Sequence, residues 1–362
     1  MMNAVKNIFL CTLPTIIIVL LMLELFFRIA IPASDPPMGY FDEEQKIYSM
    51  SNQKKEGVIT IGKFAQIRAR WRINNMHWNY PIDYYPVEDK KLIAVIGDSY
   101  IEAFQVDVDE NYPYLLRKRL YPNYEVYAAG KSGAALSQYL HISRYLNKHF
   151  DPDILIFNIM HNDFDESIRE LYPNSYHFMQ LSIAQDGSIK ETTPRPNYSY
   201  PQYTTWKRVV YKSALFRYLD FNLNVRQIRH KIMAVQDGTY EANIKPEEAK
   251  RNQALIYKAT NYLVKTIREE NRDKRVIFVF DAPKQAIYNN SLHESKVLWM
   301  HEMMDTICSM NNIEFIDLTP LMEKDFQVNR RKFNSELDGH WNEYGHEFVA
   351  SVLFAHLTHD EQ

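Results

Sequence analysis

The stretch "KLIAVIGDSYIEAF", residues 91–104, joins a short apolar run to a glycine, an acid and a hydroxyl. The apolar run has the length of a buried strand, and the residues after it resemble the start of a helix. Ser99 therefore has two interpretations. It is a helix cap, because serine is a favoured N-cap residue, or it is a nucleophile presented at the end of a strand.

The alternation of strand and helix continues along the chain. Further apolar runs of strand length are "YEVYAAG", "DILIFNIM", "RVIFVFDA" and "IEFIDLT", and segments with apolar residues at helical spacing separate them. Such alternation predicts a mainly parallel sheet with helices on both faces. We expect an α/β fold with three layers, α/β/α.

Composition narrows the class of protein. The chain has 362 residues, is 46% hydrophobic and carries a net charge of −3. These values indicate a globular body with a large core and argue against nucleic acid as a partner. The two cysteines, Cys11 and Cys308, are far apart in the sequence, so no disulfide framework is expected.

The N-terminus predicts a membrane anchor over residues 1–33. No charge interrupts Ile8 to Leu23, and only Glu24 and Arg28 interrupt the apolar residues that follow. These two are spaced i,i+4 and can pair on one face of a helix. The run is long enough to cross the roughly 30 Å hydrocarbon layer. A cleaved signal peptide is the rival interpretation, but Ile31 occupies a position where a cleavage site needs a small residue.

Charges on either side of the apolar run predict its orientation. Lys6 precedes it, whereas acidic residues follow it, namely Asp35, Asp42, Glu43 and Glu44. This contrast favours a single-pass protein with its N-terminus in the cytoplasm and its body outside. The expected location is a bacterial inner membrane, with the body periplasmic or extracellular.

Three further regions follow the anchor. Residues 34–57 are polar, contain "SDPPMG", and are predicted to be a linker, and residues 58–362 are predicted to form the α/β domain. Between the third and fourth strands, an insertion at about 165–250 breaks the alternation, and we expect it to form a lid. It contains a predicted hairpin around Asp186-Gly187. Its aromatic residues stack on sugars or pack the lid onto the domain, and the sequence leaves both open: Tyr172, Tyr176, Tyr198, Tyr200, Tyr203 and Trp206.

Polar residues and glycines follow several of the predicted strands. Ser99 follows the first, Gly133 lies just after the second, and Asn162 follows the third. Ligands of open α/β sheets bind at the carboxyl ends of the strands. Asp338 and His340 come just before the last helix and complete a possible Ser-His-Asp set.

These motifs resemble those of the SGNH hydrolase (GDSL-like esterase) superfamily. The matching blocks are "GDSY" at 97–100, "AAGKSG" at 128–133, "HND" at 161–163 and "DGHWNEYGH" at 338–346, in the family's order. The resemblance covers residues 92–357 without the insertion, and it implies a flavodoxin-like three-layer fold. Three departures stand out. Met160 replaces a glycine, Ala128 replaces an asparagine, and Asp338 lies two residues before His340 instead of three, a spacing found in periplasmic branches that act on exopolysaccharide.

Acyl transfer assigns a role to each residue. Ser99 is the expected nucleophile, His340 its general base, and Asp338 the acid that orients the imidazole. The expected oxyanion donors are the backbone N–H groups of Ser99 and Gly133 and the side-chain amide of Asn162. His161, Asp163 and Trp341 adjoin these residues in the sequence and are expected to contact substrate.

The expected activity is removal of a small acyl group, acetyl above all, from a carbohydrate through an acyl-Ser99 intermediate. Two alternatives stay open. One is a polysaccharide O-acyltransferase with the same triad, supplied by a membrane acyl-donor protein, and the other is an inactive envelope protein that binds glycan. No cofactor is expected. No metal is expected either, because His340 and His346 are six residues apart and helical zinc ligands are spaced i,i+4.

Overall fold

Five parallel strands form the central sheet of the computed structural model, which describes residues 8–196, 205–223 and 240–359. Their spatial order is β11-β10-β7-β5-β6. Numbered along the chain, this is the 2-1-3-4-5 order of flavodoxin-like folds, so the predicted class is confirmed. The strands are β5 (Lys91–Gly97), β6 (Tyr124–Gly130), β7 (Ile154–Ile159), β10 (Arg275–Phe280) and β11 (Glu314–Asp317).

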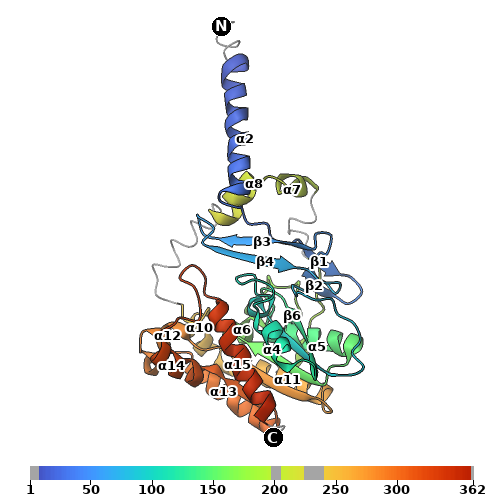
Figure 1. The fold of residues 1–362 in the computed structure, drawn as a ribbon. Coiled ribbons are helices and arrows are strands. Elements are labelled where there is room, and N and C mark those ends of the chain that lie inside the picture. Colours follow the sequence, from blue (N-terminus) through green and yellow to red (C-terminus); the bar gives the residue numbers. More distant parts are fainter. Residues whose placement is uncertain (1–7, 197–204, 224–239, 360–362) are drawn as a thin grey trace.

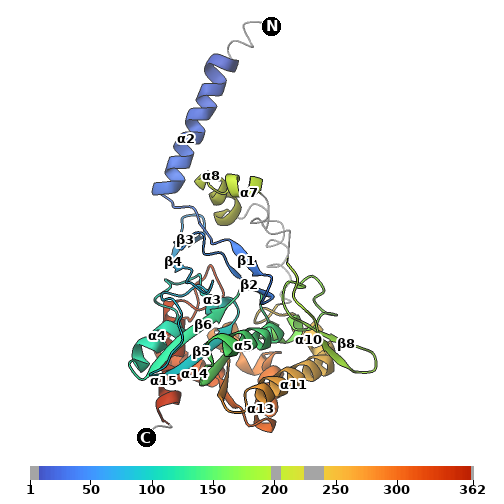
Figure 2. The same cartoon turned by 90° about the vertical axis from the view of Figure 1, so that its right-hand side faces the viewer.

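Helices cover both faces of this sheet (Figure 2). α4 packs against α15 on one face, and α11 packs against α5 and α13 on the other. Every residue of β6 and β7 is buried, as expected for strands that are covered on both sides. The main helices are α4 (Tyr112–Leu120), α5 (Leu136–Phe150), α11 (Gln253–Glu270), α13 (Leu298–Met310), α14 (Leu318–Asn329) and α15 (Glu343–His359). Shorter helices are α3 (Ser99–Glu102), α6 (Asn162–Glu166), α12 (Lys284–Tyr288) and η4 (Leu292–Glu294).

An apolar helix projects from the body at the N-terminal end (Figure 1). A π-helical turn, η1 (Ile8–Thr12), leads into α2 (Leu13–Ile29). Within the described ranges, Phe9–Ile29 is the helical stretch that is long and apolar enough to cross a membrane, and none of it is buried. The predicted pair forms, with Arg28 Nη2 at 2.6 Å from Glu24 Oε1.

The residues expected to form a linker, 34–57, are instead part of the folded body. β1 (Gly39–Asp42) and β2 (Ile47–Met50) form an antiparallel hairpin, and all four residues of β2 are buried. Ile47 and Tyr48 belong to the main hydrophobic core. The many polar residues around this short run conceal it in the sequence. A second hairpin, β3 (Glu56–Ile61) with β4 (Ile67–Arg72), lies between α2 and the main sheet (Figure 1).

The insertion lies between β7 and β10, as predicted, but its described parts occupy separate places. β8 (Leu181–Ile183) and β9 (Ile189–Glu191) form the predicted hairpin, which is tied to the core by an Arg144–Glu191 ion pair. α7 (Thr205–Val210), α8 (Ala214–Arg217) and η3 (Tyr218–Asn222) lie at the base of α2 in both views (Figures 1 and 2). α10 (Pro246–Arg251) returns to the body. Three of the insertion's tyrosines, Tyr198, Tyr200 and Tyr203, fall outside the described residues.

Candidate active site

Ser99 begins α3 directly after β5, but it does not cap that helix. Asp98 is the N-cap, and its Oδ1 accepts the Tyr100 backbone N–H at 2.9 Å. Burial raises the pKa of Asp98 to about 6, and the bond from Tyr100 partly opposes that rise. Because the neighbouring acid takes the capping role, the Ser99 hydroxyl is left to interact across the site.

The partner of that hydroxyl is His340. Ser99 Oγ lies 2.7 Å from His340 Nε2, and His340 Nδ1 lies 2.5 Å from Asp338 Oδ1. The same Asp338 oxygen accepts the His340 backbone N–H at 2.9 Å. This tight turn explains how an acid only two residues before the histidine reaches the far side of its ring. The three side chains therefore form a Ser-His-Asp triad.

A second set of contacts holds the loop that carries His340. The Tyr100 hydroxyl donates to the Gly339 carbonyl at 3.0 Å, and Trp341 Nε1 donates to Asp281 Oδ1 at 2.9 Å. Lys284 forms an ion pair with Asp281 and donates to the Tyr100 hydroxyl at 3.1 Å. Residues on both sides of the histidine are thus fixed to the ends of β5 and β10. Asp281 was not among the residues predicted from the sequence, although its position at the end of the fourth strand was a usable signal.

The expected oxyanion donors follow three adjacent strands. Ser99, Gly133 and Asn162 come after β5, β6 and β7, which are neighbours in the order β7-β5-β6. Gly133 has a φ of 79°, a conformation that favours glycine. A Cβ built there would be 3.5 Å from the nearest atom of Phe178, which is an ordinary contact. Backbone conformation, rather than the protein space around it, therefore requires glycine here.

Asn162 stands at the start of α6 with its amide partly engaged. Its side chain hydrogen bonds the carboxyl of Glu166, one turn later, whose pKa burial raises to about 7. Asn162 Oδ1 is buried without a hydrogen-bond partner. The amide nitrogen carries two N–H groups, so a bond to Glu166 leaves one for an oxyanion.

A buried ion pair organises the loop that contains Gly133. Glu102, at the end of α3, is 2% exposed and lies 2.9 Å from the Nζ of Lys131, which is 5% exposed. The other oxygen of Glu102 accepts the backbone N–H of Ser132 at 2.9 Å and also binds its hydroxyl. At Gly130 a Cβ would be only 2.2 Å from the Glu102 backbone nitrogen, so α3 packs directly on the end of β6. The helix that begins with Ser99 and the loop that contains Gly133 are therefore held together.

Two residues expected to contact substrate are fully buried. Asp163 Oδ2 accepts the Met160 N–H at 2.7 Å and the Tyr139 hydroxyl at 2.9 Å, and burial raises its pKa. Trp341 is 0% exposed. Both side chains support the site from within the core and do not reach the surface. Asp163 lies after the third core strand and Trp341 lies next to His340, as the sequence indicates. The prediction that their side chains contact substrate is wrong, because both side chains point into the core.

His161 is also buried, but it borders a cavity. Its Nε2 lies 2.9 Å from His301 Nε2, and His301 Nδ1 lies 3.1 Å from Asp317 Oδ1. Burial and the neighbouring His301 hold the pKa of His161 well below its usual value. His161 is therefore linked to an acid, Asp317, through a second histidine, and its contacts within the described residues do not include Ser99.

His346, which belongs to the same sequence block as His340, is a packing residue. Its Nδ1 accepts the Tyr112 backbone N–H at 3.2 Å, and burial lowers its pKa to about 3. Across residues 8–196, 205–223 and 240–359, no group of three or more His, Cys, Asp or Glu side chains is arranged to hold a metal ion.

Two cavities border the loop that carries His340. One, of about 700 Å³, is lined by Tyr100, His161 and Gly339 together with residues of the insertion from 240 to 251. The other, of about 500 Å³, is lined by Asp338 and His340 together with Gln66 and Arg68 from the β3–β4 hairpin. Sequence reasoning missed this contribution, because nothing in residues 58–86 marks them as part of a site.

Comparisons with known proteins find likeness in solved structures. No family model matches the sequence, and no curated protein matches it. A lipase/acylhydrolase from Enterococcus faecalis shows 12% identity and a TM-score of 0.40, over 74% of this chain and 95% of its own. The acetyl xylan esterase AlAXEase shows 12% identity and a TM-score of 0.38, over 73% and 98%. LAE5, an α/β hydrolase from the metagenome of Lake Arreo in Spain, shows 14% identity and a TM-score of 0.39, over 75% and 96%.

The geometry predicts that His340 and His161 differ sharply in their effect on activity. We expect His340→Ala to lower kcat on an activated ester such as p-nitrophenyl acetate by about 10³-fold or more, because the base is lost. His161→Ala should lower the melting temperature, because it opens a buried contact with His301, and should change kcat far less. Steady-state kinetics and thermal unfolding check both variants, and the opposite ranking in kcat would assign the base to His161.

The buried Glu102 predicts a second effect, on the oxyanion loop. We expect Glu102→Gln to lower kcat roughly 10- to 100-fold with little change in KM, because the Ser132–Gly133 backbone shifts. Glu125→Gln is the matched control, since Glu125 is also buried and pairs with Arg117 away from the triad. Both variants should lose stability. Equal kcat values in the two, measured well below their melting temperatures, would show that Glu102 is only structural.

Proposed function

We propose that this chain is a serine esterase of the SGNH type that removes a small acyl group, acetyl above all, from a carbohydrate. The observation that carries the proposal is the triad, with Ser99 Oγ at 2.7 Å from His340 Nε2 and Asp338 at 2.5 Å from Nδ1 of the same ring. A serine cannot attack an ester efficiently unless a base takes its proton, and this arrangement supplies one.

In the proposed reaction, each residue of the site has one role. Ser99 Oγ bonds to the ester carbonyl carbon while His340 takes its proton, and Asp338 stabilises the imidazolium. Negative charge develops on the carbonyl oxygen, where the Ser99 and Gly133 N–H groups and the Asn162 amide donate. The carbon–oxygen bond to the alcohol breaks and His340 protonates the leaving oxygen. Water, activated by His340, then releases the acid and restores Ser99.

The surroundings of the triad favour a polar substrate with a small acyl group. The larger cavity, which borders Tyr100 and Gly339 beside the triad, is lined by several charged side chains, among them Lys245, Glu248, Arg251 and Lys284, as well as by apolar surface. A long acyl chain needs an apolar channel, because its transfer from water is favourable only into apolar surroundings. Sugars, in contrast, present hydroxyls that such side chains can bind.

An O-acyltransferase is the second candidate, because it uses the same triad. It differs in the last step, where a sugar hydroxyl instead of water attacks the acyl-Ser99. The third expectation, an inactive glycan-binding protein, rested on the unusual spacing of Asp338 and His340. The contact between their side chains speaks against it.

The apolar helix is proposed as a single-pass anchor with the N-terminus in the cytoplasm and the body outside. The length and composition of Phe9–Ile29 support crossing. Lys6 before the helix and the acidic residues after it support this orientation. In a bacterial inner membrane, the body would face the periplasm or the cell exterior.

Covalent labelling tests the nucleophile. A fluorophosphonate should label the full-length protein in detergent, and Ser99→Ala should abolish the label, because the probe reacts only with an activated serine. Acetate release from a panel of acetylated glycans then identifies the substrate class, and acetyl transfer to an added glycan separates transferase from hydrolase. Absence of labelling of the folded protein would reject the esterase.

The position of the C-terminus tests the orientation. Fused after Gln362, an alkaline phosphatase reporter should be active, because that enzyme folds only outside the cytoplasm. A green fluorescent protein fused at the same place is the reciprocal control and should stay dark after export through the general secretory route. Reporter activity only inside the cell would reverse the proposed topology.

A further inference from the structure

The part of the insertion between residues 205 and 222 is attached to the anchor helix. Figures 1 and 2 both place α7 and α8 beside the lower end of α2, with the β3–β4 hairpin between them and the main sheet. α8 contacts α2, and η3 contacts β3. This segment therefore does not cover Ser99 as a lid would, and its position beside α2 indicates a different role.

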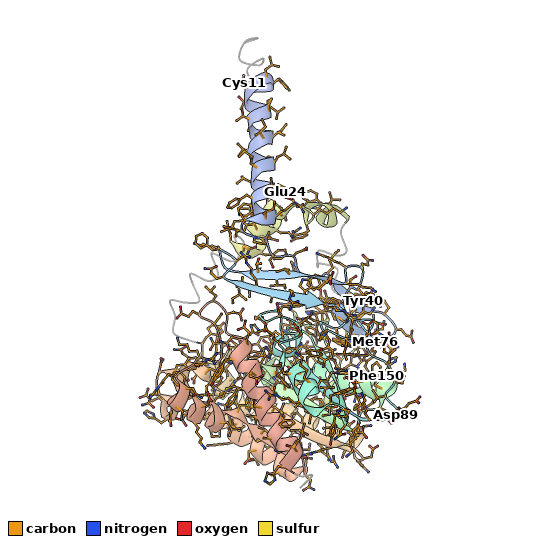
Figure 3. The ribbon with its side chains drawn as sticks, in the orientation of Figure 1. Cys11, Glu24, Tyr40, Met76, Asp89 and Phe150 are labelled. Atoms are coloured by element: carbon orange, nitrogen blue, oxygen red, sulfur yellow. The ribbon has the colours of Figure 1, made fainter. Side chains whose placement is uncertain are left out.

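Glu24 makes the central attachment, at the point labelled in Figure 3. Its Oε1 accepts the Ala214 N–H at 2.9 Å, and its Oε2 accepts the Ser213 hydroxyl at 2.7 Å and the Leu215 N–H at 3.0 Å. Arg28 pairs with Glu24 and donates to the Lys212 carbonyl at 2.8 Å. A carboxylate in an apolar helix is costly unless it is paired. Here the start of α8 supplies the partners.

Apolar and polar contacts extend this attachment toward the body. Phe27 stacks on Tyr218 with ring centroids 3.8 Å apart and an interplanar angle of 19°. The side chain of Asn222 accepts the Ser34 N–H at 2.9 Å and donates to Thr60 Oγ1 at 2.9 Å. The segment is thus fixed to the anchor on one side and to β3 on the other.

The length of the helix sets the depth of these contacts. A hydrocarbon layer of about 30 Å takes up about 20 helical residues at about 1.5 Å each. Counted from Phe9, that length ends near Arg28, so Glu24 lies within about 6 Å of the boundary. Residues hydrogen bonded to Glu24 must lie at the same level, where acyl chains give way to headgroups.

Exposed apolar side chains occur in α7, which Figures 1 and 2 place near the lower end of α2, and in η3, which follows α8. Trp206 and Val209 are three residues apart on α7 and are 68% and 61% exposed, and Leu219 and Phe221 of η3 are 41% and 38% exposed. Exposing large apolar side chains such as these to water is unfavourable. Tryptophan and phenylalanine are typical of the membrane interface, where an apolar ring is solvated by acyl chains.

We propose that residues 205–222 form an interfacial segment that seats in the headgroup–acyl boundary of the bilayer crossed by α2. The proposal rests on the proposed membrane anchor, not on the proposed ester chemistry. The segment holds the body in one orientation against the membrane. The β3–β4 hairpin, whose Lys63 carbonyl accepts the Tyr218 hydroxyl at 2.9 Å, also lines the cavity that contains His340. The β3–β4 hairpin therefore connects the proposed interfacial segment to the cavity beside His340.

Tryptophan fluorescence in lipid bilayers tests this placement in the full-length protein. The chain has five tryptophans, and Trp71, Trp78 and Trp341 are buried, while Trp299 is half-buried in α13 at the opposite end of the body. In liposomes of lipids brominated at carbons 6 and 7, the Trp206 emission should be quenched, and Trp206→Phe should remove the quenched component. The conservative change at an exposed position leaves the fold intact.

A matched reporter makes the result decisive. Val328 is 76% exposed and belongs to α14, a helix that Figure 1 shows far from α2. Val328→Trp in the Trp206→Phe background should therefore escape bromolipid quenching and respond to aqueous iodide. The proposal would be overturned if iodide, and not bromolipid, quenched the Trp206 emission. In that case the anchor would still stand if the protein remained in the membrane during carbonate extraction. Loss of the protein from membranes in carbonate would reject the anchor and the segment together. Neither result bears on fluorophosphonate labelling of Ser99.

Discussion

The hydrogen bond between Ser99 and His340 joins two points 241 residues apart in the chain. It closes only when the first core strand and the loop before the last helix meet at one edge of the sheet. Asp338 sets the direction of the imidazole from within a two-residue turn, and Tyr100 and Asp281 hold the flanking residues. The triad therefore forms only in the folded tertiary structure, because its members lie in segments that are far apart in the sequence.

The Glu102–Lys131 pair imposes a second constraint on the same edge. Burying two charges is expensive, and well-packed apolar residues of similar volume are often at least as stabilising. Stability alone thus gives little reason for the pair. Its second carboxylate oxygen binds Ser132, one residue before Gly133, so the charges fix a backbone position beside the nucleophile's helix. The Glu102–Lys131 pair is therefore better explained by its effect on the position of the Ser132 backbone than by its contribution to stability.

Sequence reasoning succeeded where one physical rule decided the answer. Strand-length apolar runs gave the parallel sheet, and the strand-end rule brought Ser99 and His340 to one edge. It failed where the direction or the environment of a side chain decided. Asp163 follows a strand end but points into the core, where Tyr139 binds it. The polar stretch 34–57 hides the buried β2, because four residues are too few for periodicity to be recognised.

Glu24, a polar residue in an apolar helix, connects that helix to the rest of the protein. Its spacing predicted the pair with Arg28, but a pair alone would serve equally well in an isolated helix. The structure adds the start of α8 to the same carboxylate. α8 leads into η3, which is bonded to the β3–β4 hairpin, and that hairpin lines the cavity beside His340. These contacts connect Glu24 to the cavity beside His340, so a bilayer crossed by α2, as proposed, would set the height of the triad above the membrane.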